Sequence, residues 1–304
     1  MSILQQLSSA LTDMTQTASP FVVAVAGGTR FGASGVVWQP GAVVTTRSTL
    51  RRDDKLRITL PGGQTAAATL AGHDGATDLA VLTYEAPADN GGVGGRPALA
   101  ASAKPGEVIL AVGRSENTGV NAALGVVSAV GPGWQTWQGG KIDGYLRLDV
   151  TLYPGGSGAA VINANGELLG ITSGALSRIA PLAIPAATME RVVQQLLTQG
   201  KVRKPWLGVA VQPVPIPATL AEAANSLTHG LVVLAAEPET PAGRAGILVG
   251  DILLSIDNTP VRDPMDLRQL LGARAPGDKA RMLLLRGGER KEIEAELGER
   301  NGRR

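Results

Sequence analysis

The sequence predicts a mostly β protein built from two domains. Short apolar runs recur from residue 21 onward and are separated by glycine, proline or charged clusters, a spacing that is typical of β-barrels and sandwiches. Glycine contributes 40 of the 304 residues, as expected where many short strands are joined by tight turns. The length favours two domains, each with enough residues to bury its own core.

Residues 1–19 are expected to form an amphipathic helix that packs on the body of the protein. Four apolar residues recur here at helical spacing: Leu4, Leu7, Leu11 and Met14. Ser2 and Gln5 have the spacing of a capping box, and Pro20 breaks the pattern. A secretory leader needs a basic start and a continuous apolar run, which this segment lacks. We therefore expect a cytoplasmic location, or a periplasmic one if the natural chain has lost a leader.

Residues 20–200 contain two sets of predicted strands. The first set covers 21–26, 35–38, 42–46, 56–60 and 79–84. The second set covers 108–112, 122–130, 145–150 and the apolar runs on both sides of Ser157. A helix ending at Gly200 closes this domain, with an apolar face made of Met189, Val192, Val193, Leu196 and Leu197. The short basic segment 201–205 is expected to be a linker.

The charge balance and the residue types present exclude several classes of function. The 28 basic and 26 acidic residues nearly cancel, so the chain has no strong field for nucleic acid. No apolar run approaches the roughly 20 residues that span a bilayer, so we expect no membrane span. The absence of cysteine rules out disulfides and thiolate chemistry. We expect neither a cofactor nor a metal site.

The tight turn at residues 154–158, Pro-Gly-Gly-Ser-Gly, is the strongest candidate for chemistry. A serine flanked by glycines between two predicted strands suits a nucleophile, because the sharp turn points successive N–H groups at one spot. The amides of Gly155, Gly156 and Ser157 are the candidate oxyanion hole. A plain β-turn that happens to contain a serine is the alternative, and the surrounding residues favour the nucleophile.

The segment 149–173 resembles the nucleophile segment of HtrA/Deg family trypsin-like serine proteases, which reads roughly D-x-x-x-x-P-G-N-S-G-G-P-L. The resemblance implies a trypsin-like double six-stranded β-barrel, with Ser157 at the nucleophile position. Two positions depart from the pattern. Gly156 replaces the family asparagine and Ala159 replaces the second glycine, which we expect to disturb the oxyanion loop.

Of the other two positions of the catalytic triad, one matches the family pattern and the other does not. Residues 76–82 match the family string T-D-L-A-V-L, which puts Asp78 at the triad aspartate. The segment 35–50 resembles the stretch that carries the catalytic histidine, but Ser48 stands at the histidine position. A serine hydroxyl cannot act as the base at neutral pH. The only two histidines, His73 and His229, fall elsewhere, where surface or half-buried roles are expected.

Residues 206–298 resemble a PDZ domain, an α+β fold. Trp206, Leu207, Gly208 and Val209 match its carboxylate-binding loop, and residues 241–253 match a longer motif of such domains. Asp263 and Pro264 are expected to start a helix whose Leu267 and Leu271 line the pocket for the last peptide side chain. Peptide binding is the favoured role, and a packing or oligomerisation module is the alternative. Residues 299–304 are expected to be a frayed tail.

Together these observations predict a catalytically inactive HtrA-like pseudoprotease. Its expected partners are polypeptides or protein C-termini, which it binds as a scaffold or regulator in protein quality control. A homo-oligomer, such as the trimers of the family, or a hetero-complex is possible. One alternative is an active serine endopeptidase with a base from elsewhere, which fluorophosphonate labelling of Ser157 discriminates. Another is a chaperone-like holdase, which suppression of client aggregation discriminates.

Overall fold

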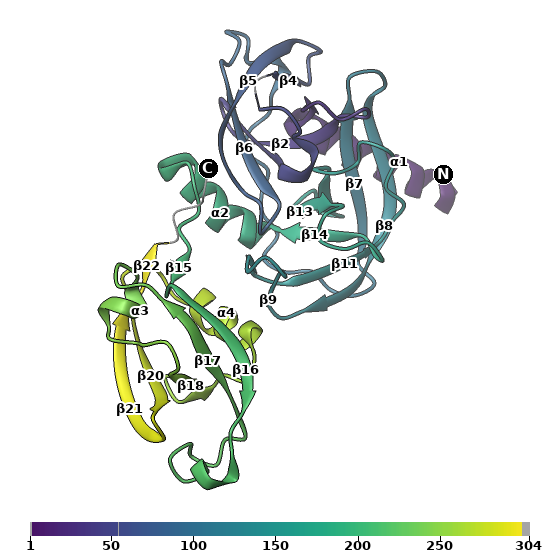
Figure 1. The fold of residues 1–304 in the computed structure, drawn as a ribbon. Coiled ribbons are helices and arrows are strands. Elements are labelled where there is room, and N and C mark those ends of the chain that lie inside the picture. Colours follow the sequence, from purple (N-terminus) through teal and green to yellow (C-terminus); the bar gives the residue numbers. More distant parts are fainter. Residues whose placement is uncertain (1, 54, 300–304) are drawn as a thin grey trace. The chain divides into compact units, whose positions relative to one another are not determined.

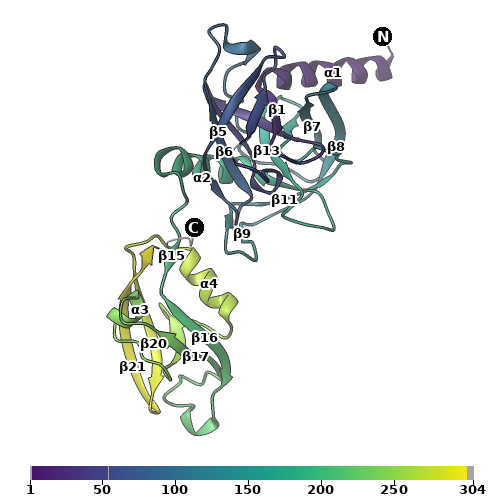
Figure 2. The same ribbon diagram turned by 45° about the horizontal axis from the view of Figure 1, so that its top comes forward.

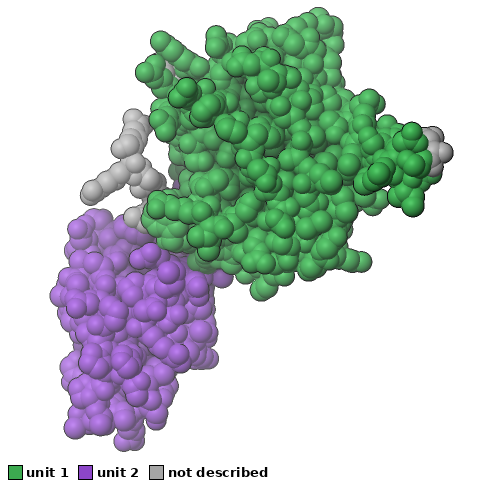
Figure 3. Space-filling view, turned by 90° about the vertical axis from the view of Figure 1, so that its right-hand side faces the viewer, with its two compact units in different colours: residues 1–202 green, residues 203–304 purple. Residues whose placement is uncertain are grey.

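A computed structural model describes residues 2–53 and 55–299 of the chain, which divides into two compact units. Unit 1 comprises Met1–Val202 and unit 2 comprises Arg203–Arg304 (Figure 3). No helix in the described part of the chain is both long enough and apolar enough to cross a bilayer.

Unit 1 contains two closed six-stranded barrels, which confirms the predicted double barrel (Figure 1). The first barrel, in spatial order, consists of β1 (Val22–Ala26), β2 (Ala33–Gln39), β3 (Ala42–Thr46), β6 (Leu79–Tyr84), β5 (Thr65–Asp74) and β4 (Leu56–Thr59). The second consists of β11 (Tyr145–Asp149), β14 (Leu182–Pro185), β13 (Leu168–Ser173), β12 (Ala160–Asn163), β7 (Val108–Ser115) and β8 (Gly119–Gly131). A small hairpin, β9 (Trp134–Gln135) with β10 (Lys141–Ile142), and three short 3₁₀ turns, η1 (Ser19–Phe21), η2 (Arg47–Thr49) and η3 (Asn90–Gly92), complete the connections.

The strands that carry the candidate site are buried on both faces. Every residue of β3 and β13 is buried, and β6 is buried at all positions except Thr83. This happens because one face of β6 fills its barrel while α2 (Ala186–Gln199) packs against the other side of the sheet. The apolar face predicted for this helix is buried, and Gly200 ends it in a left-handed conformation with φ of +69°. The candidate site is therefore carried by strands that are packed on both faces.

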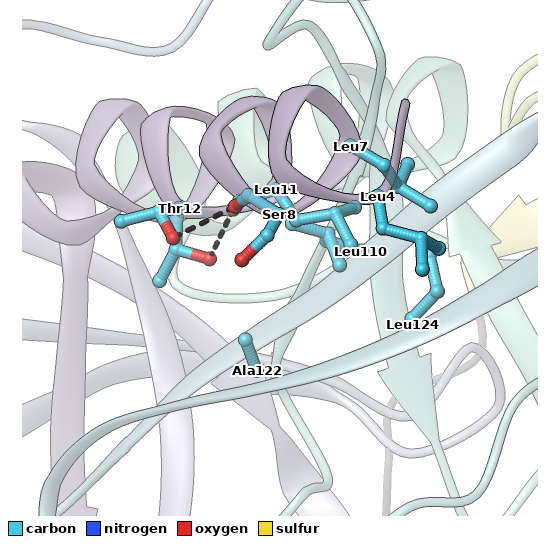
Figure 4. A pocket seen from close by; sticks show the side chains of 9 residues that line it. Leu4, Leu7, Ser8, Leu11, Thr12, Leu110, Ala122 and Leu124 are labelled. Atoms are coloured by element: carbon cyan, nitrogen blue, oxygen red, sulfur yellow. Dashed lines mark hydrogen bonds between the residues drawn. The ribbon is translucent and has the colours of Figure 1, made fainter. Parts of the chain in front are cut away.

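The N-terminal helix α1 (Ile3–Ala18) begins with the predicted capping box but packs on the body along only part of its length. Leu11 and Met14 contact the core and Ala18 is fully buried, whereas Ile3 and Leu4 are 82% and 76% exposed. Figure 2 shows the start of the helix extending away from the barrels. Between the helix and β7 and β8 lies a pocket with a mixed polar and apolar lining: Leu4, Leu7, Ser8, Leu11, Thr12, Thr15, Leu110, Ala122 and Leu124 (Figure 4).

Unit 2 is built on one antiparallel sheet with a helix beside it. The sheet order is β16 (Val209–Pro215), β17 (His229–Ala236), β18 (Ile252–Ile256), β20 (Lys279–Arg286) and β21 (Glu289–Glu296), with β19 (Thr259–Pro260) paired to β18. The other elements are α3 (Pro241–Arg244), α4 (Pro264–Gly272), η4 (Ala218–Leu220) and the pair β15 (Pro205–Trp206) with β22 (Gly298–Glu299). Asp263 caps α4 as predicted, because its carboxylate accepts the N–H groups of Met265 and Asp266.

Two of the predicted domain boundaries, those of the linker and of the tail, differ from the structure. Pro205, expected in the linker, and Glu299, expected in the frayed tail, pair with each other in β15 and β22. The ion pair between Arg203 and Glu299, at 2.9 Å, lies directly beside this pairing. The rest of the expected tail, residues 300–304, lies outside the described residues.

Candidate active site and peptide groove

Asp78 is the centre of the candidate active site. It precedes β6 in the left-handed region, with φ of +62°, a conformation that a non-glycine residue adopts only where its surroundings hold it. Its carboxylate accepts the Ser48 N–H at 2.7 Å and the Ser48 hydroxyl at 3.0 Å. The hydroxyl of Ser173, at the end of β13, donates to the same carboxylate at 2.6 Å. Ser48 therefore occupies the place beside Asp78 that an imidazole takes in a triad.

Asp78 and Ser173 are buried, whereas Ser48 is exposed, and burial raises the pKa of the Asp78 carboxyl above its ordinary value of 3.8. Hydrogen bonds from Ser173 and Ser48 favour the charged form, as does the charge of Arg47, but burial outweighs them. A buried acid with a raised pKa stabilises the fold while it is protonated and loses that contribution as the pH rises. The site thus retains a carboxylate at a cost to the stability of unit 1 at neutral pH.

Replacing Asp78 by asparagine should therefore raise the unfolding temperature of unit 1 at neutral pH. We expect a gain of about 1 kcal/mol, of the order found when a buried charge is exchanged for a neutral group. The gain should disappear as the pH falls toward 3.8, because the wild-type carboxyl is then protonated. Thermal unfolding at several pH values tests this. Ser173→Ala is the matched control, since it removes a donor to the charged form and should destabilise more at high pH.

Ser157 lies next to this cluster. The N–H of Gly174 donates to its Oγ at 3.2 Å, and Gly174 directly follows the Ser173 that binds Asp78. Two consecutive residues at the end of β13 therefore join the nucleophile position to the Asp78 network. Of the three residues that the sequence singles out, Ser48 and Asp78 are in direct contact, and Ser157 is linked to them through Gly174 and Ser173.

Within the described part of the chain, Ser157 Oγ has no proton acceptor at hydrogen-bonding distance, because its one partner there, the Gly174 N–H, is itself a donor. The guanidinium of Arg47 turns away and binds the Leu50 carbonyl and the Asp53 carboxylate. A serine hydroxyl is a weak nucleophile unless an adjacent base takes its proton, so the presence or absence of such a base decides the chemistry of this site.

The two histidines lie elsewhere. His73 is exposed on β5, and His229 in unit 2 is bonded to the Thr228 hydroxyl at 3.0 Å. Both histidines are exposed, in agreement with the surface roles expected from the sequence.

The oxyanion loop keeps two of the three predicted donors. Among the described residues, the N–H groups of Gly155 and Ser157 donate no hydrogen bond, and Gly155 has the φ of +89° that the sharp turn requires. Gly156 is a correction to the sequence prediction, because its N–H donates to the Tyr153 carbonyl at 2.8 Å. The candidate oxyanion hole consists of Gly155 and Ser157.

This loop is anchored, contrary to the disturbance that the sequence led us to expect. Gly158 N–H donates to the Thr172 carbonyl at 2.8 Å, and Ala159 N–H donates to the Thr172 hydroxyl at 3.1 Å. Ala159, at the position of the second family glycine, is fully buried without breaking either bond. A Cβ on Gly156 would lie 2.9 Å from the Tyr153 carbonyl oxygen, so the family asparagine would need a slightly different turn here.

Two further residues support the site, and sequence reasoning missed both. Ser34 donates its N–H to the Ser157 carbonyl at 2.9 Å and accepts the Arg114 N–H on its hydroxyl at 3.1 Å. The Arg114 side chain is buried and binds the carbonyls of Val22 and Ser19 at 2.7 and 3.0 Å. Burial lowers the pKa of this guanidinium. The network ties the nucleophile turn to both barrels and to the end of α1.

The candidate peptide site of unit 2 begins where β15 ends. Among the described residues, the N–H groups of Leu207 and Gly208 donate no hydrogen bond, although Leu207 is only 1% exposed. Gly208 has φ of +82°, and a Cβ there would lie 2.4 Å from the Cβ of Thr240, so the close turn requires glycine. The N–H of Ala242 donates to the Leu207 carbonyl at 2.8 Å and fixes the loop. Adjacent unpaired amides of this kind receive a carboxylate.

The remaining predicted peptide-site residues frame this loop. Val209 starts β16, while Trp206 is 36% exposed at the end of β15. Leu267 and Leu271 of α4 are 6% and 9% exposed and lie in the same core cluster as Leu207. They belong to the core of unit 2 and expose little of their surface to a ligand, which corrects the pocket-lining role expected from the sequence.

Comparisons with known proteins agree with this architecture. The model of the trypsin-like peptidase domain matches residues 33–171, and the model of the PDZ domain matches residues 205–297. A probable periplasmic serine endoprotease, DegP-like, of Brucella suis is 32% identical over 280 residues, which are 86% of this chain and 51% of that protein. The serine endoprotease DegS of Haemophilus influenzae is 28% identical over 266 residues, 85% of this chain and 74% of that protein. The chain spans about half the length of the DegP-like relatives that it matches.

Solved structures agree as well. The serine endoprotease from Yersinia pestis superposes with a TM-score of 0.72 at 27% identity, covering 96% of this chain and 98% of that one. The HtrA-type protease AlgW, solved with a decapeptide, has a TM-score of 0.73 at 25% identity and covers 96% and 99%. The names of the DegP-like relatives place those proteins in the periplasm, and nothing here supports the cytoplasmic location expected from the sequence.

Proposed function

Because the chain belongs to the HtrA/DegP family of trypsin-like serine proteases with a PDZ domain, we propose that it is a non-cleaving member that binds polypeptide C-termini. One observation carries the proposal: Ser48 fills the place beside Asp78, so Ser157 has no base among the described residues. In subtilisin, loss of the histidine alone costs about 10⁶ in kcat. The remaining oxyanion-hole donors still bind a substrate but contribute little to catalysis.

Binding is assigned to unit 2. The unpaired amides of Leu207 and Gly208 provide a receptor for a carboxylate, and the free edge of β16 provides a place for an added strand. A relative solved with a decapeptide supports the same class of ligand. The protein would then act as a scaffold or regulator in protein quality control, in the periplasm as the names of its relatives suggest.

The test combines cleavage and binding on the full chain. We expect no turnover of casein or of unfolded peptides, and labelling of Ser157 by a fluorophosphonate only at the slow rate of an unactivated serine. Turnover that is lost in Ser157→Ala would establish instead an active endopeptidase with a base supplied from elsewhere. Calorimetry should detect binding of peptides with hydrophobic C-termini. Their C-terminal amides should bind at least about fivefold more weakly, because an unpaired buried donor costs about 1 to 3 kcal/mol.

A further inference from the structure

Four exposed arginines of unit 1 come from segments that adjoin the candidate active site. We call them the cationic rim, and they are Arg30, Arg51, Arg52 and Arg57. They fall within residues 20–57, which contain six basic residues and only two acidic ones. The formal net charge of the whole chain is only +2, so this short segment carries more positive charge than the entire protein. The balanced total charge therefore hides a local concentration of positive charge.

Backbone contacts hold the segments of the cationic rim against one another. The N–H groups of Arg51 and Arg52 both donate to the Gly27 carbonyl, at 2.8 and 3.4 Å. Arg57 lies in β4 directly opposite Ala26, which is the last residue of β1. The end of β1 therefore brings these three arginines together, although they belong to different elements.

The turn between β1 and β2, which carries Arg30, adjoins both halves of the candidate site. An added Cβ on Gly27 would lie 3.0 Å from the carbonyl oxygen of Thr49, at the end of the 3₁₀ turn η2 that also holds the vacant base position. Farther along, an added Cβ on Gly155 would lie 2.6 Å from the Phe31 carbonyl oxygen. The cationic rim therefore extends from η2 to the loop that carries the oxyanion donors.

The charges of the cationic rim are not used inside the protein. Within the described residues, none of its four guanidinium groups forms an ion pair. The only described acid of the segment, Asp53, lies 3.4 Å from Arg47 and is already paired. Arg30 lies 5.4 Å from the centroid of the Phe31 ring, which is 60% exposed. The sequence of the nucleophile turn, 151–158, contains no charged residue. The rim thus remains available to a ligand of opposite charge.

The chemistry of this surface favours an acidic polypeptide as that ligand. A guanidinium group is a planar fork that matches a carboxylate through two parallel hydrogen bonds. The adjoining loop has features that suit a polypeptide. The N–H groups of Gly155 and Ser157, free among the described residues, can receive a carbonyl oxygen, and the exposed ring of Phe31 can contact an apolar side chain.

A nucleic acid fits this surface less well. Its binding depends on basic residues that follow the phosphate backbone over a long track. Outside residues 20–57 the chain has 22 basic and 24 acidic residues, so the positive charge does not continue beyond the segment. A short acidic stretch of polypeptide needs no such track.

We propose that the cationic rim binds an acidic stretch of polypeptide on unit 1. This goes beyond the proposed function, which assigns binding to unit 2. The rim contains no receptor built for a chain end, so the stretch can lie within a chain. Exposed charges attract one another over about 10 Å at 0.1 M salt, and binding at the rim should therefore weaken strongly as the salt concentration rises.

The experiment is fluorescence anisotropy on the full chain with two labelled peptides. One contains a run of six aspartates beside a leucine, and the other has asparagine at the same six positions. Both have amidated C-termini, so that the carboxylate loop of unit 2 has no group to bind. At about 50 mM salt the wild type should bind the aspartate peptide at least about tenfold more tightly than the asparagine peptide, and about 500 mM salt should remove the difference.

Arg30→Gln with Arg51→Gln and Arg52→Gln is the rim variant. It should bind the aspartate peptide about tenfold more weakly than the wild type, as expected for the loss of three exposed ion pairs. All three side chains are exposed and keep their backbone N–H groups, so the fold should be retained, which thermal unfolding checks.

Lys104→Gln with Arg262→Gln and Arg268→Gln is the matched control, because it removes the same charge from three exposed side chains outside the rim. It should bind the aspartate peptide as the wild type does. Equal weakening in both variants would show that only the net charge matters, and equal affinity for the two peptides would show that the rim does not recognise carboxylates. Either result overturns the proposal. So does a single-stranded oligonucleotide of equal charge that binds the wild type more tightly than the aspartate peptide and loses this affinity in the rim variant.

Discussion

Replacing Ser48 by histidine should make Ser157 react with a fluorophosphonate at least about a hundredfold faster than in the wild type, since a positioned general base contributes about 10²- to 10⁴-fold. The surroundings of residue 48 are already those of a triad base. Its N–H is held by Asp78 at 2.7 Å, and its side chain points at the second carboxylate oxygen at 3.0 Å. An imidazole there has an orienting carboxylate in place.

The other half of the site is also retained in Ser48→His. The nucleophile turn is anchored to Thr172, and the amides of Gly155 and Ser157 stay free for an oxyanion. Labelling rates of the wild type, Ser48→His and Ser48→Ala check this, with Ser48→His in a Ser157→Ala background as the blank. Ser48→Ala removes the hydroxyl without adding a base and should stay at the wild-type rate. An unchanged rate in Ser48→His would falsify the assignment of position 48.

Gly158→Ala should reduce the stability of unit 1 by at least about 3 kcal/mol, because two costs add at one buried position. A Cβ on Gly158 would lie 2.0 Å from the Ser34 carbonyl oxygen, a backbone atom that cannot move aside without shifting β2. The residue also has φ of +81°, which costs an alanine about 1 kcal/mol on its own.

Gly119→Ala separates these two costs. Gly119 has φ of +71°, and an added Cβ there would meet open space. Gly119→Ala should therefore lower the free energy of unfolding only by the backbone cost of about 1 kcal/mol. Denaturant unfolding of both variants measures the difference. A loss in Gly158→Ala no larger than in Gly119→Ala would mean that the turn and β2 adapt readily, and that the nucleophile position is less fixed than its contacts indicate.

Much of the fold follows from local patterns in the sequence. The stripe of α2, its Gly200 cap, the Asp263 cap of α4 and the alternation of short apolar runs all act within a few residues of one another. The family motifs placed Ser48, Asp78 and Ser157 in one site. Aligning the chain with the family motif shows which residue stands at each motif position. The absence of a histidine at position 48 was therefore evident from the sequence alone.

What the sequence did not predict depends on residues far apart in the chain. Ser173 donates to Asp78 from 95 positions away, and Arg114 reaches Ser19 over the same separation. Nothing in their local sequence distinguishes these residues from other buried polar side chains. Gly156 was assigned to the oxyanion hole from its place in the turn, and only the turn geometry shows that Tyr153 takes its N–H. Tertiary contacts decide which polar groups remain available.

Some N–H groups of the nucleophile turn are hydrogen-bonded and others are not. This difference makes ligand binding at the site measurable even when no substrate is cleaved. Gly158 and Ala159 donate to β13, so their deuterium exchange requires an opening of the barrel. Gly155 and Ser157 have no such bond among the described residues and should exchange far faster. An acyl oxygen seated between the two fast amides would slow them alone, so exchange mass spectrometry reports directly on a ligand that is held and never cut.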